Sequence, residues 1–300
     1  MRRRQGPEPE SQFTSLPGLR IHELHWRSPH GGPPIVLLHG LASNARIWEL
    51  CAPRLAAAGL DVWAIDLRGH GVSGKPRGGY DFPTIREDIE QWLRVRRLQR
   101  PLLVGHSWGA YLAVEVARRS RTRPRGLVLV DGAMSQLADV PGATWHAVRQ
   151  RLAPPRLAGL TVAELQARLT APGRAWALDE RALPIVFANF HIDRKGRIRP
   201  HLTRDRHLRI LRSIWEYRVY REYPELACPV LLIPSVPPIP RTPEDELYLR
   251  EKRKGVALAR KEIQEVRVSW MRNTIHDIPL QRPVALANRI LQFAAGPRTR

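Results

Sequence analysis

Residues 101–109 read Pro101-Leu102-Leu103-Val104-Gly105-His106-Ser107-Trp108-Gly109, an apolar run that ends in the pattern Gly-x-Ser-x-Gly. The run predicts a buried strand, and a helix-like segment over residues 110–119 follows it at once. The chain must therefore turn sharply, which glycine permits, and such a turn leaves the serine hydroxyl exposed. Two glycines and a serine at this spacing also arise by chance. Ser107 is a candidate nucleophile if the rest of the chain supplies its partners.

Apolar runs on both sides of this stretch alternate with helical patterns. Further strands are predicted over residues 21–26, 33–39, 61–67, 127–130, 229–233 and 266–270. Strands that alternate with helices at this spacing form a mostly parallel sheet with helices on its faces. The sequence therefore predicts the α/β class, with a central sheet flanked by helices.

One long segment breaks this alternation. Residues 134–220 are helical in pattern, aromatic and basic, and they contain no long apolar run. They predict a helical cap inserted after the sixth strand, into a core that spans residues 19–133 and 221–296. Residues 1–18 have little to bury and are expected to form a mobile tail, and residues 297–300 a second short tail.

Polar residues follow several of the predicted strands, where functional groups of parallel sheets collect. His39, Asp66, Ser107 and Asp131 each stand just past an apolar run. A serine nucleophile needs a base within hydrogen-bond reach, and that base needs a third group to hold its tautomer. His276, in the loop after the last predicted strand, is the candidate base, although a loop histidine is also a common surface residue.

Several separate motifs now concur, and the chain resembles the α/β-hydrolase superfamily over about residues 21–296. The resemblance rests on His39-Gly40-Leu41, the glycine-rich loop from Asp66 to Gly74, the elbow around Ser107, and the late His276. It implies an oxyanion hole formed by the backbone N–H groups of Leu41 and Trp108. It further implies that the loop of residues 66–74 is structural, and we expect His39 and His106 to support loops rather than react.

The chain departs from the usual pattern of this superfamily at the acid. Members generally carry it shortly after the strand that follows the cap, but here that strand runs into Pro234-Ser235-Val236-Pro237-Pro238. A minority arrangement places the acid one strand earlier, and Asp131 occupies that position. Asp131 is preferred over Glu244 or Asp245. A purely structural turn residue before Gly132 is the alternative reading of Asp131.

A serine nucleophile implies attack on carbonyls and an acyl-enzyme, whereas members with aspartate there, such as haloalkane dehalogenases, form alkyl-enzyme esters. The resemblance therefore implies a serine hydrolase, first a carboxylesterase, acting on a small-molecule acyl substrate without metal or organic cofactor. A C–C bond hydrolase, a lactonase and a cofactor-free peroxidase share this site and stay open. A non-catalytic ligand-binding relative stays open too, because the acid is displaced.

The composition adds limits on partners and location. The formal net charge is +21, from 49 Lys and Arg against 28 Asp and Glu, but the arginines are spread along the chain without a nucleic-acid-binding motif. No nucleic-acid partner is expected. Cys51 and Cys228 are the only cysteines, which indicates neither a disulfide framework nor a metal site. No apolar run is long enough to cross a bilayer, so we expect a cytoplasmic protein without membrane contact.

Overall fold

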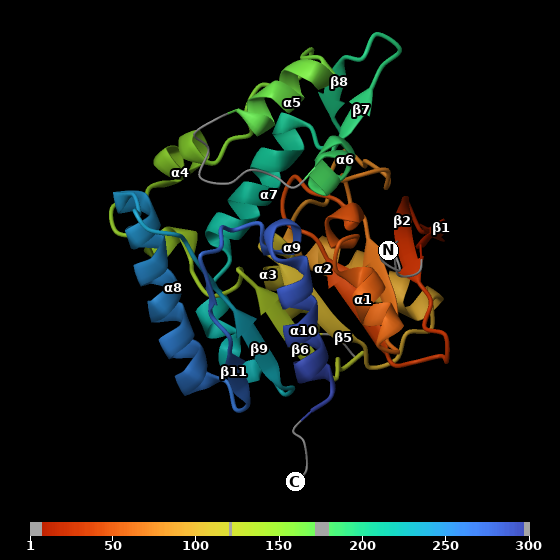
Figure 1. The fold of residues 1–300 in the computed structure, drawn as a ribbon. Helices are drawn as coiled ribbons and strands as arrows, with labels where there is room; N and C mark the ends of the chain where they lie inside the picture. The colour runs from red at the N-terminus through yellow and green to blue at the C-terminus, as the bar shows by residue number, and fades with distance from the viewer. Residues whose placement is uncertain (1–7, 120–121, 172–179, 297–300) are drawn as a thin grey trace, which may run out of the picture.

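The computed structural model describes residues 8–119, 122–171 and 180–296, and its centre is one sheet of eight strands (Figure 1). In chain order they are β1 (Glu10–Leu16), β2 (Leu19–Trp26), β3 (Pro34–Leu38), β4 (Asp61–Ile65), β5 (Leu102–His106), β6 (Gly126–Val130), β9 (Val230–Ile233) and β11 (Val266–Val268). Their spatial order is β1-β2-β4-β3-β5-β6-β9-β11. β2 pairs antiparallel with β1 and β4, and all other pairs are parallel. The predicted α/β fold with a mostly parallel sheet is confirmed.

Helices cover both faces of this sheet. They are α1 (Ala52–Ala57), α2 (Phe82–Val95), α3 (Trp108–Arg119), α8 (Pro243–Glu262), α9 (Ile278–Gln281) and α10 (Pro283–Ala294), with the 3-10 turn η1 (Ala45–Trp48) before α1. Successive residues of β3 alternate between two apolar clusters: Val36 joins α2, α3 and α8, whereas Ile35 joins α1 and α10. A strand between two helical layers is buried on both faces. This burial explains why the strands read as continuous apolar runs.

The first strand corrects the expectation of a mobile tail over residues 1–18. Residues 10–16 form β1, which pairs with β2 from Glu10 opposite His25 to Leu16 opposite Leu19. Gly18, at φ +70°, makes the turn between the two strands. β1 is an edge strand and only its last residues are well buried, so its sequence is mostly polar and resembles a tail. Residues 1–7 and the expected tail at 297–300 lie outside the described residues.

The segment between β6 and β9 lies above the carboxyl ends of the parallel strands (Figure 1). It contains η2 (Leu137–Asp139), α4 (Trp145–Arg151), α5 (Val162–Thr170), η3 (Glu180–Ala182), α6 (Leu183–Phe187), β7 (Phe190–Ile192), β8 (Ile198–Pro200), α7 (Arg204–Glu216), η4 (Val219–Arg221) and η5 (Tyr223–Glu225). The expectation of a wholly helical insertion over residues 134–220 is therefore wrong in one part. β7 and β8 form an antiparallel hairpin, because the turn at Asp193 and Gly196 brings two short strands together.

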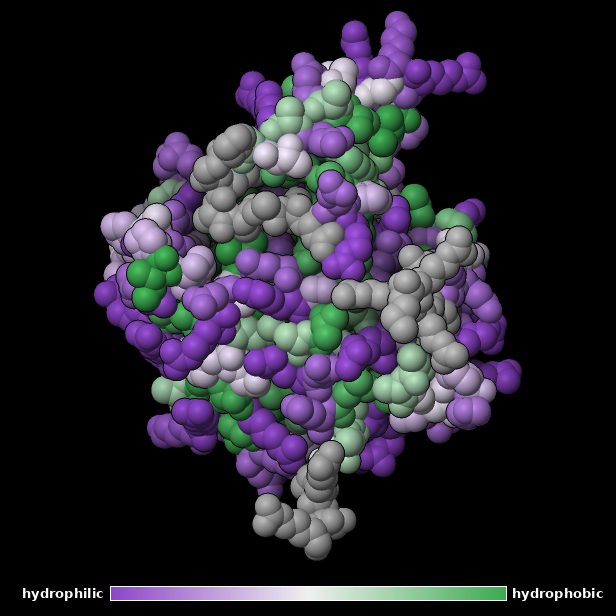
Figure 2. Space-filling model, in the orientation of Figure 1, coloured by the Kyte–Doolittle hydropathy of each residue, from purple (hydrophilic) through white to green (hydrophobic). Residues whose placement is uncertain are grey.

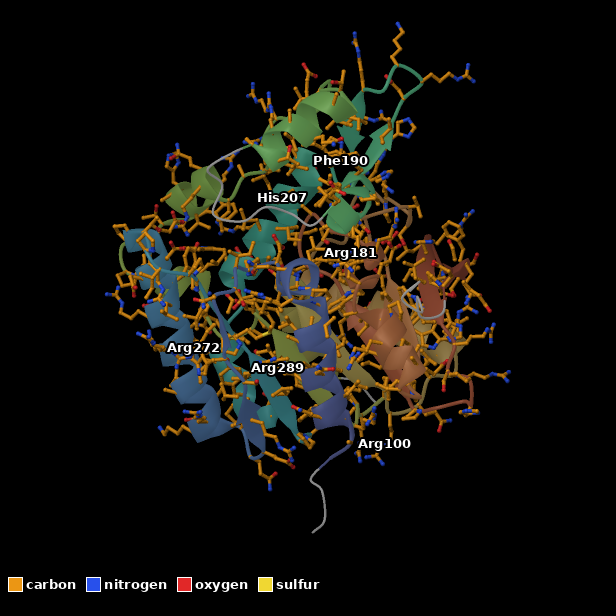
Figure 3. All side chains as sticks on the ribbon, viewed as in Figure 1. Arg100, Arg181, Phe190, His207, Arg272 and Arg289 are labelled. Atoms are coloured by element: carbon orange, nitrogen blue, oxygen red, sulfur yellow. The ribbon has the colours of Figure 1, made fainter. Side chains whose placement is uncertain are left out.

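The arginines of this basic chain come from many separate elements. Figure 2 shows mainly hydrophilic side chains on the face in view, and the arginines labelled in Figure 3 come from separate elements. Arg100 precedes β5, Arg289 lies on α10, and Arg272 lies on β12 (Met271–Arg272), which pairs with β10 (Ser235–Val236). Among the described residues, no helix is both long and apolar enough to cross a membrane.

Candidate active site

Ser107 stands alone in the turn between β5 and α3. β5 ends at His106 and α3 begins at Trp108, so one residue reverses the chain direction. Its φ is +53°, in the left-handed region that residues with a Cβ rarely adopt. The Ser107 N–H donates to the Val130 carbonyl at 2.9 Å, and its carbonyl accepts from the Ala110 N–H at 3.0 Å. The turn is thus fixed on both sides.

Three glycines allow the chain to pack this closely around Ser107. A Cβ on Gly105 would lie 2.2 Å from the Gly109 carbonyl oxygen, and one on Gly109 would lie 2.4 Å from the Leu38 carbonyl oxygen. Gly132, after β6, is equally restricted, because its Cβ would lie 2.1 Å from the Ser107 carbonyl oxygen. Gly105 and Gly109 belong to the sequence motif. Gly132 does not, yet it is required by the same turn.

Gly109→Ala is expected to destabilise the fold by about 1–3 kcal/mol, the typical cost of overpacking a filled core. Gly109 has ordinary helical geometry, so the clash of the new methyl group with backbone atoms of β3 is the sole cause. The midpoint of urea unfolding measures the effect. Gly78→Ala is the matched control, because a Cβ there meets nothing within 4 Å. Equal midpoints for the two variants would contradict this packing argument.

His276 connects the nucleophile turn to Asp131. It lies in the loop between β12 and α9, where its Nε2 is 2.8 Å from Ser107 Oγ and its Nδ1 is 2.7 Å from Asp131 Oδ2. The Nδ1–H donates to the carboxylate, so Nε2 is free to accept the hydroxyl proton. The backbone carbonyl of His276 accepts a hydrogen bond from His106 Nε2 at 2.9 Å. This bond anchors the loop to β5.

Asp131 follows the last residue of β6 and is also held at a positive φ, +43°. Its side chain is completely buried. The carboxylate accepts hydrogen bonds from the backbone N–H and the hydroxyl of Ser235, both at 2.8 Å, and it forms an ion pair with Lys252 at 2.8 Å. The geometry therefore places Asp131, one strand from the nucleophile, in contact with the candidate base.

The two alternative acids lie elsewhere. Glu244 is more than half exposed on the first turn of α8, where it pairs with Arg151. Asp245 caps the same helix, because its carboxylate accepts hydrogen bonds from the backbone N–H and the hydroxyl of Thr242. Neither residue forms a hydrogen bond with His276 among the described residues.

The ionisation states favour proton transfer to His276. Burial raises the pKa of Asp131, but the charge of Lys252 and the hydrogen bond from His276 outweigh it and hold that pKa below its usual value. For His276, partial removal from water lowers the pKa, but the hydrogen bond and charge of Asp131 outweigh this and raise it. Burial lowers the pKa of His106 to about 4. His106 is therefore neutral and His276 is the more basic imidazole.

The two amides expected to form an oxyanion hole lie beside Ser107. Gly40 is adjacent to the nucleophile, since a Cβ on it would lie 3.0 Å from Ser107 Cβ. Its carbonyl accepts a hydrogen bond from His39 Nδ1 at 2.7 Å. Because a trans peptide sets its C=O and N–H in opposite directions, this bond turns the Leu41 N–H away from His39. Trp108 is buried at the first turn of α3, whose terminal amides have no partner within the helix.

The residues expected to be structural do support these loops. His39 Nε2 accepts from the Leu67 N–H at 3.0 Å, which links the loop of residues 39–41 to the loop of residues 66–74. In that loop, Asp66 accepts from His22 Nδ1 and from the N–H groups of Ala45 and Val72. His70 stacks on the ring of Trp108, with centroids 5.4 Å apart. His39 and the loop of residues 66–74 thus hold neighbouring loops in place, and the hydrogen bond from His106 to the His276 carbonyl does the same.

A cavity of about 530 Å³ lies between the inserted segment and the core loops beside Leu41. Ala42 and His70 line it from the core, and Leu202 lines it from the inserted segment. Phe190 and His207, labelled in Figure 3, also line it from the inserted segment. Apolar atoms make up most of its surface. Ser107 and His276 do not line it, but Ala42, which does, directly follows Leu41 in the chain.

The sequence did not reveal Ser235 or Lys252 as parts of this site. Ser235 lies in a proline-rich stretch, and Lys252 is one charge among many on α8, so both resemble ordinary surface residues. In the sequence, Gly132 is recognisable only as the neighbour of Asp131, and its close approach to the Ser107 carbonyl is visible only in the structure. Within the described ranges, no three or more His, Cys, Asp or Glu side chains are grouped so as to hold a metal ion.

Comparison with known proteins finds similarity to hydrolases over part of the chain. Over 163 residues the chain is 32% identical to a haloalkane dehalogenase of Mycobacterium marinum, which covers 53% of this chain and 54% of that protein. Over 108 residues it is 34% identical to a 2-(acetamidomethylene)succinate hydrolase of Mesorhizobium japonicum, covering 36% of this chain and 38% of that protein. These matches span about half or less of the curated relatives.

Solved structures share the fold over nearly the whole chain. The crystal structure of E-2-(acetamidomethylene)succinate hydrolase superposes with a TM-score of 0.76 at 21% identity, covering 96% of this chain and all of that one. An esterase from Exiguobacterium antarcticum gives 0.72 at 17% identity, with coverage of 96% and 100%. A family model described as the alpha/beta hydrolase family matches residues 35–289. The chain therefore belongs to the α/β-hydrolase family.

Proposed function

We propose that this protein is a serine hydrolase that cleaves a carboxylic ester or a related acyl substrate through an acyl-enzyme intermediate. One observation carries the proposal: Ser107 Oγ, His276 and Asp131 form a continuous chain of hydrogen bonds of 2.8 and 2.7 Å. Such a chain makes a weakly acidic hydroxyl nucleophilic, because the base accepts its proton as the new bond forms. The nearby His39, His70 and His106 form hydrogen bonds with backbone groups instead, so His276 is the base for this proton transfer.

The reaction follows from the positions of these groups. Ser107 Oγ attacks the carbonyl carbon of the substrate while its proton passes to His276 Nε2. The N–H groups of Leu41 and Trp108 stabilise the oxyanion, each contributing a few kcal/mol. When the tetrahedral intermediate collapses, His276 returns the proton to the leaving group and the acyl-enzyme remains. A water molecule, deprotonated by His276, then releases the acid and restores Ser107.

The residue at the nucleophile position separates this reaction from that of one relative. The Mycobacterium marinum protein is named as a haloalkane dehalogenase. Dehalogenases of this superfamily use an aspartate, and water can hydrolyse the resulting alkyl ester at its carbonyl carbon. An alkyl group on the Ser107 hydroxyl would form an ether without such a carbon, so attack on a substrate carbonyl is the chemistry that Ser107 supports. The cavity beside Leu41 is mainly apolar, and we propose that it takes the apolar part of a small-molecule substrate.

A fluorophosphonate probe tests the proposal on the full chain. The expected result is one covalent adduct per molecule, located by peptide mapping on Ser107, with labelling prevented in His276→Ala. A panel of chromogenic esters, lactones and vinylogous diketones then identifies the substrate class. Ser15→Ala is the control, because Ser15 is exposed on β1 and does not line the cavity. A folded wild-type protein that does not react would favour a non-catalytic ligand-binding relative.

A further inference from the structure

The carboxylate of Asp131 has more partners than the base alone. Its Oδ2 is 2.7 Å from His276 Nδ1, and the Ser235 N–H and hydroxyl donate to Oδ1 and Oδ2, respectively. Lys252 Nζ lies 2.8 Å from Oδ1 and 3.0 Å from Oδ2. A completely buried carboxylate is thus held by a neutral hydroxyl, an amide and a full positive charge.

Lys252 is directed to this carboxylate by its place on α8. Its side chain is 14% exposed, whereas the neighbouring Lys254 on the same helix is 52% exposed. The ammonium group also donates to the Ser235 hydroxyl at 2.7 Å and reaches the Ser235 carbonyl at 3.3 Å. These acceptors suffice for its three protons, so the lysine has one preferred position rather than a range of surface rotamers.

Ser235 and Lys252 are found beside the position where the superfamily usually carries its acid. Ser235 follows β9, the first core strand after the inserted segment, and α8 follows β9 in sequence. The acid itself comes from β6, the neighbouring strand. Ser235, just after β9, and Lys252, on α8, thus bind the acid, and β6 supplies it.

We propose that Lys252 is a positioning residue of the Ser107–His276–Asp131 group: together with Ser235 it orients the Asp131 carboxylate toward His276, and its charge partly offsets the carboxylate charge at the imidazole. A carboxylate next to a histidine favours the imidazolium, which cannot accept the proton of Ser107. A nearby ammonium opposes that effect. The lysine therefore extends the pH range of the neutral base toward lower pH.

The other charged and titratable groups around His276 do not replace this effect. Asp277, in the same loop, raises the pKa of His276, whereas Lys252 lowers it. His106, from β5, is neutral because burial lowers its pKa to about 4. Tyr111, from α3, is neutral as well, since burial raises its pKa to about 12. Lys252 thus lowers the pKa of His276, against the effect of the two carboxylates Asp131 and Asp277.

The test compares Lys252→Met with Lys254→Met, which removes the same charge from the exposed side of α8. The protonation midpoint of His276 is followed by ¹H–¹⁵N NMR of its imidazole, assigned by difference from His276→Gln. Loss of the ammonium at Lys252 is expected to raise that midpoint by about one pH unit. Lys254→Met is expected to leave it unchanged. Ser235→Ala keeps the charge and is expected to reduce kcat without moving the midpoint.

The inference rests on the proposed function only for its effect on rate, because the NMR titration needs no substrate. In an active enzyme, the acidic limb of the kcat/KM profile of Lys252→Met is expected to shift to higher pH together with the NMR midpoint. Lys252→Arg keeps the charge, so its midpoint and its acidic limb are expected to stay close to those of wild type. A midpoint within about 0.2 pH units of wild type in folded Lys252→Met would overturn the inference. If that variant does not fold, Lys252→Gln, which keeps hydrogen-bond donors but not the charge, decides by the same criterion.

Discussion

Ser107→Ala is expected to lower kcat for a responsive chromogenic ester by a factor on the order of 10⁵ to 10⁶, as removal of the activated serine does in serine hydrolases. Without Oγ no acyl-enzyme forms, and His276 has no hydroxyl from which to take a proton. The thermal midpoint is expected to stay within about 2 °C of wild type, because alanine and serine have the same Cβ at the positive φ of this turn.

The measurement is steady-state hydrolysis, with fluorophosphonate labelling under the same conditions. Ser15→Ala is the matched control and is expected to keep turnover close to wild type, because Ser15 is exposed on the edge strand β1 and does not line the cavity. Retained turnover in Ser107→Ala would contradict the assignment of the nucleophile. Loss of turnover in Ser15→Ala as well would show that the assay reports damage to the fold rather than loss of the hydroxyl.

Asp131→Asn is expected to lower kcat by about 10⁴. The amide cannot stabilise the imidazolium that forms during attack, and its NH₂ group disfavours the tautomer with Nδ1–H. This variant also leaves Lys252 as a nearly buried charge without its carboxylate. Breaking such a pair costs about 3–5 kcal/mol of folding free energy, so stability must be measured by urea unfolding beside activity.

The double variant Asp131→Asn with Lys252→Met separates the two effects. Removing both charges is expected to restore much of the lost stability, because no uncompensated ion stays buried. Activity is expected to stay low, since the base still lacks its carboxylate. Glu244→Gln is the control for the alternative acid and is expected to keep activity within about twofold of wild type, as changes to an exposed charge usually do. A large loss in that variant, with Asp131→Asn unaffected, would reverse the assignment.

The sequence sufficed to place Ser107 and Asp131 at one edge of the sheet, because each follows an apolar run and parallel strands bring their carboxyl ends together. His276 was predicted from its place in the loop after the last strand, and the role of Asp131 from the resemblance to α/β-hydrolases. In the structure their side chains form hydrogen bonds to one another, although they come from three loops. Apolar runs and strand ends do not reveal a helix residue that contacts the site from elsewhere in the sequence. Lys252 lies on a helix rich in charges, and only the tertiary packing of α8 selects it from the others.

The edge of the sheet and the inserted segment were harder to predict for a different reason. β1 buries few side chains, so its residues carry little of the apolar signal by which inner strands are found. The β7–β8 hairpin has three residues a strand, too short for a clear alternation. Local patterns reveal elements that are well buried, and both of these elements are defined mainly by backbone pairing.

The distribution of the three groups along the chain has a consequence during synthesis. Ser107 and Asp131 are synthesised well before His276, which lies 169 residues after Ser107 and 145 after Asp131. One of the two neighbours of β6 in the sheet, β9, also comes about a hundred residues after it. A nascent chain that has not yet reached His276 thus carries Ser107 without its proposed base. Such a chain cannot activate that hydroxyl by the proposed route, and the proposed site forms only after His276 has been added.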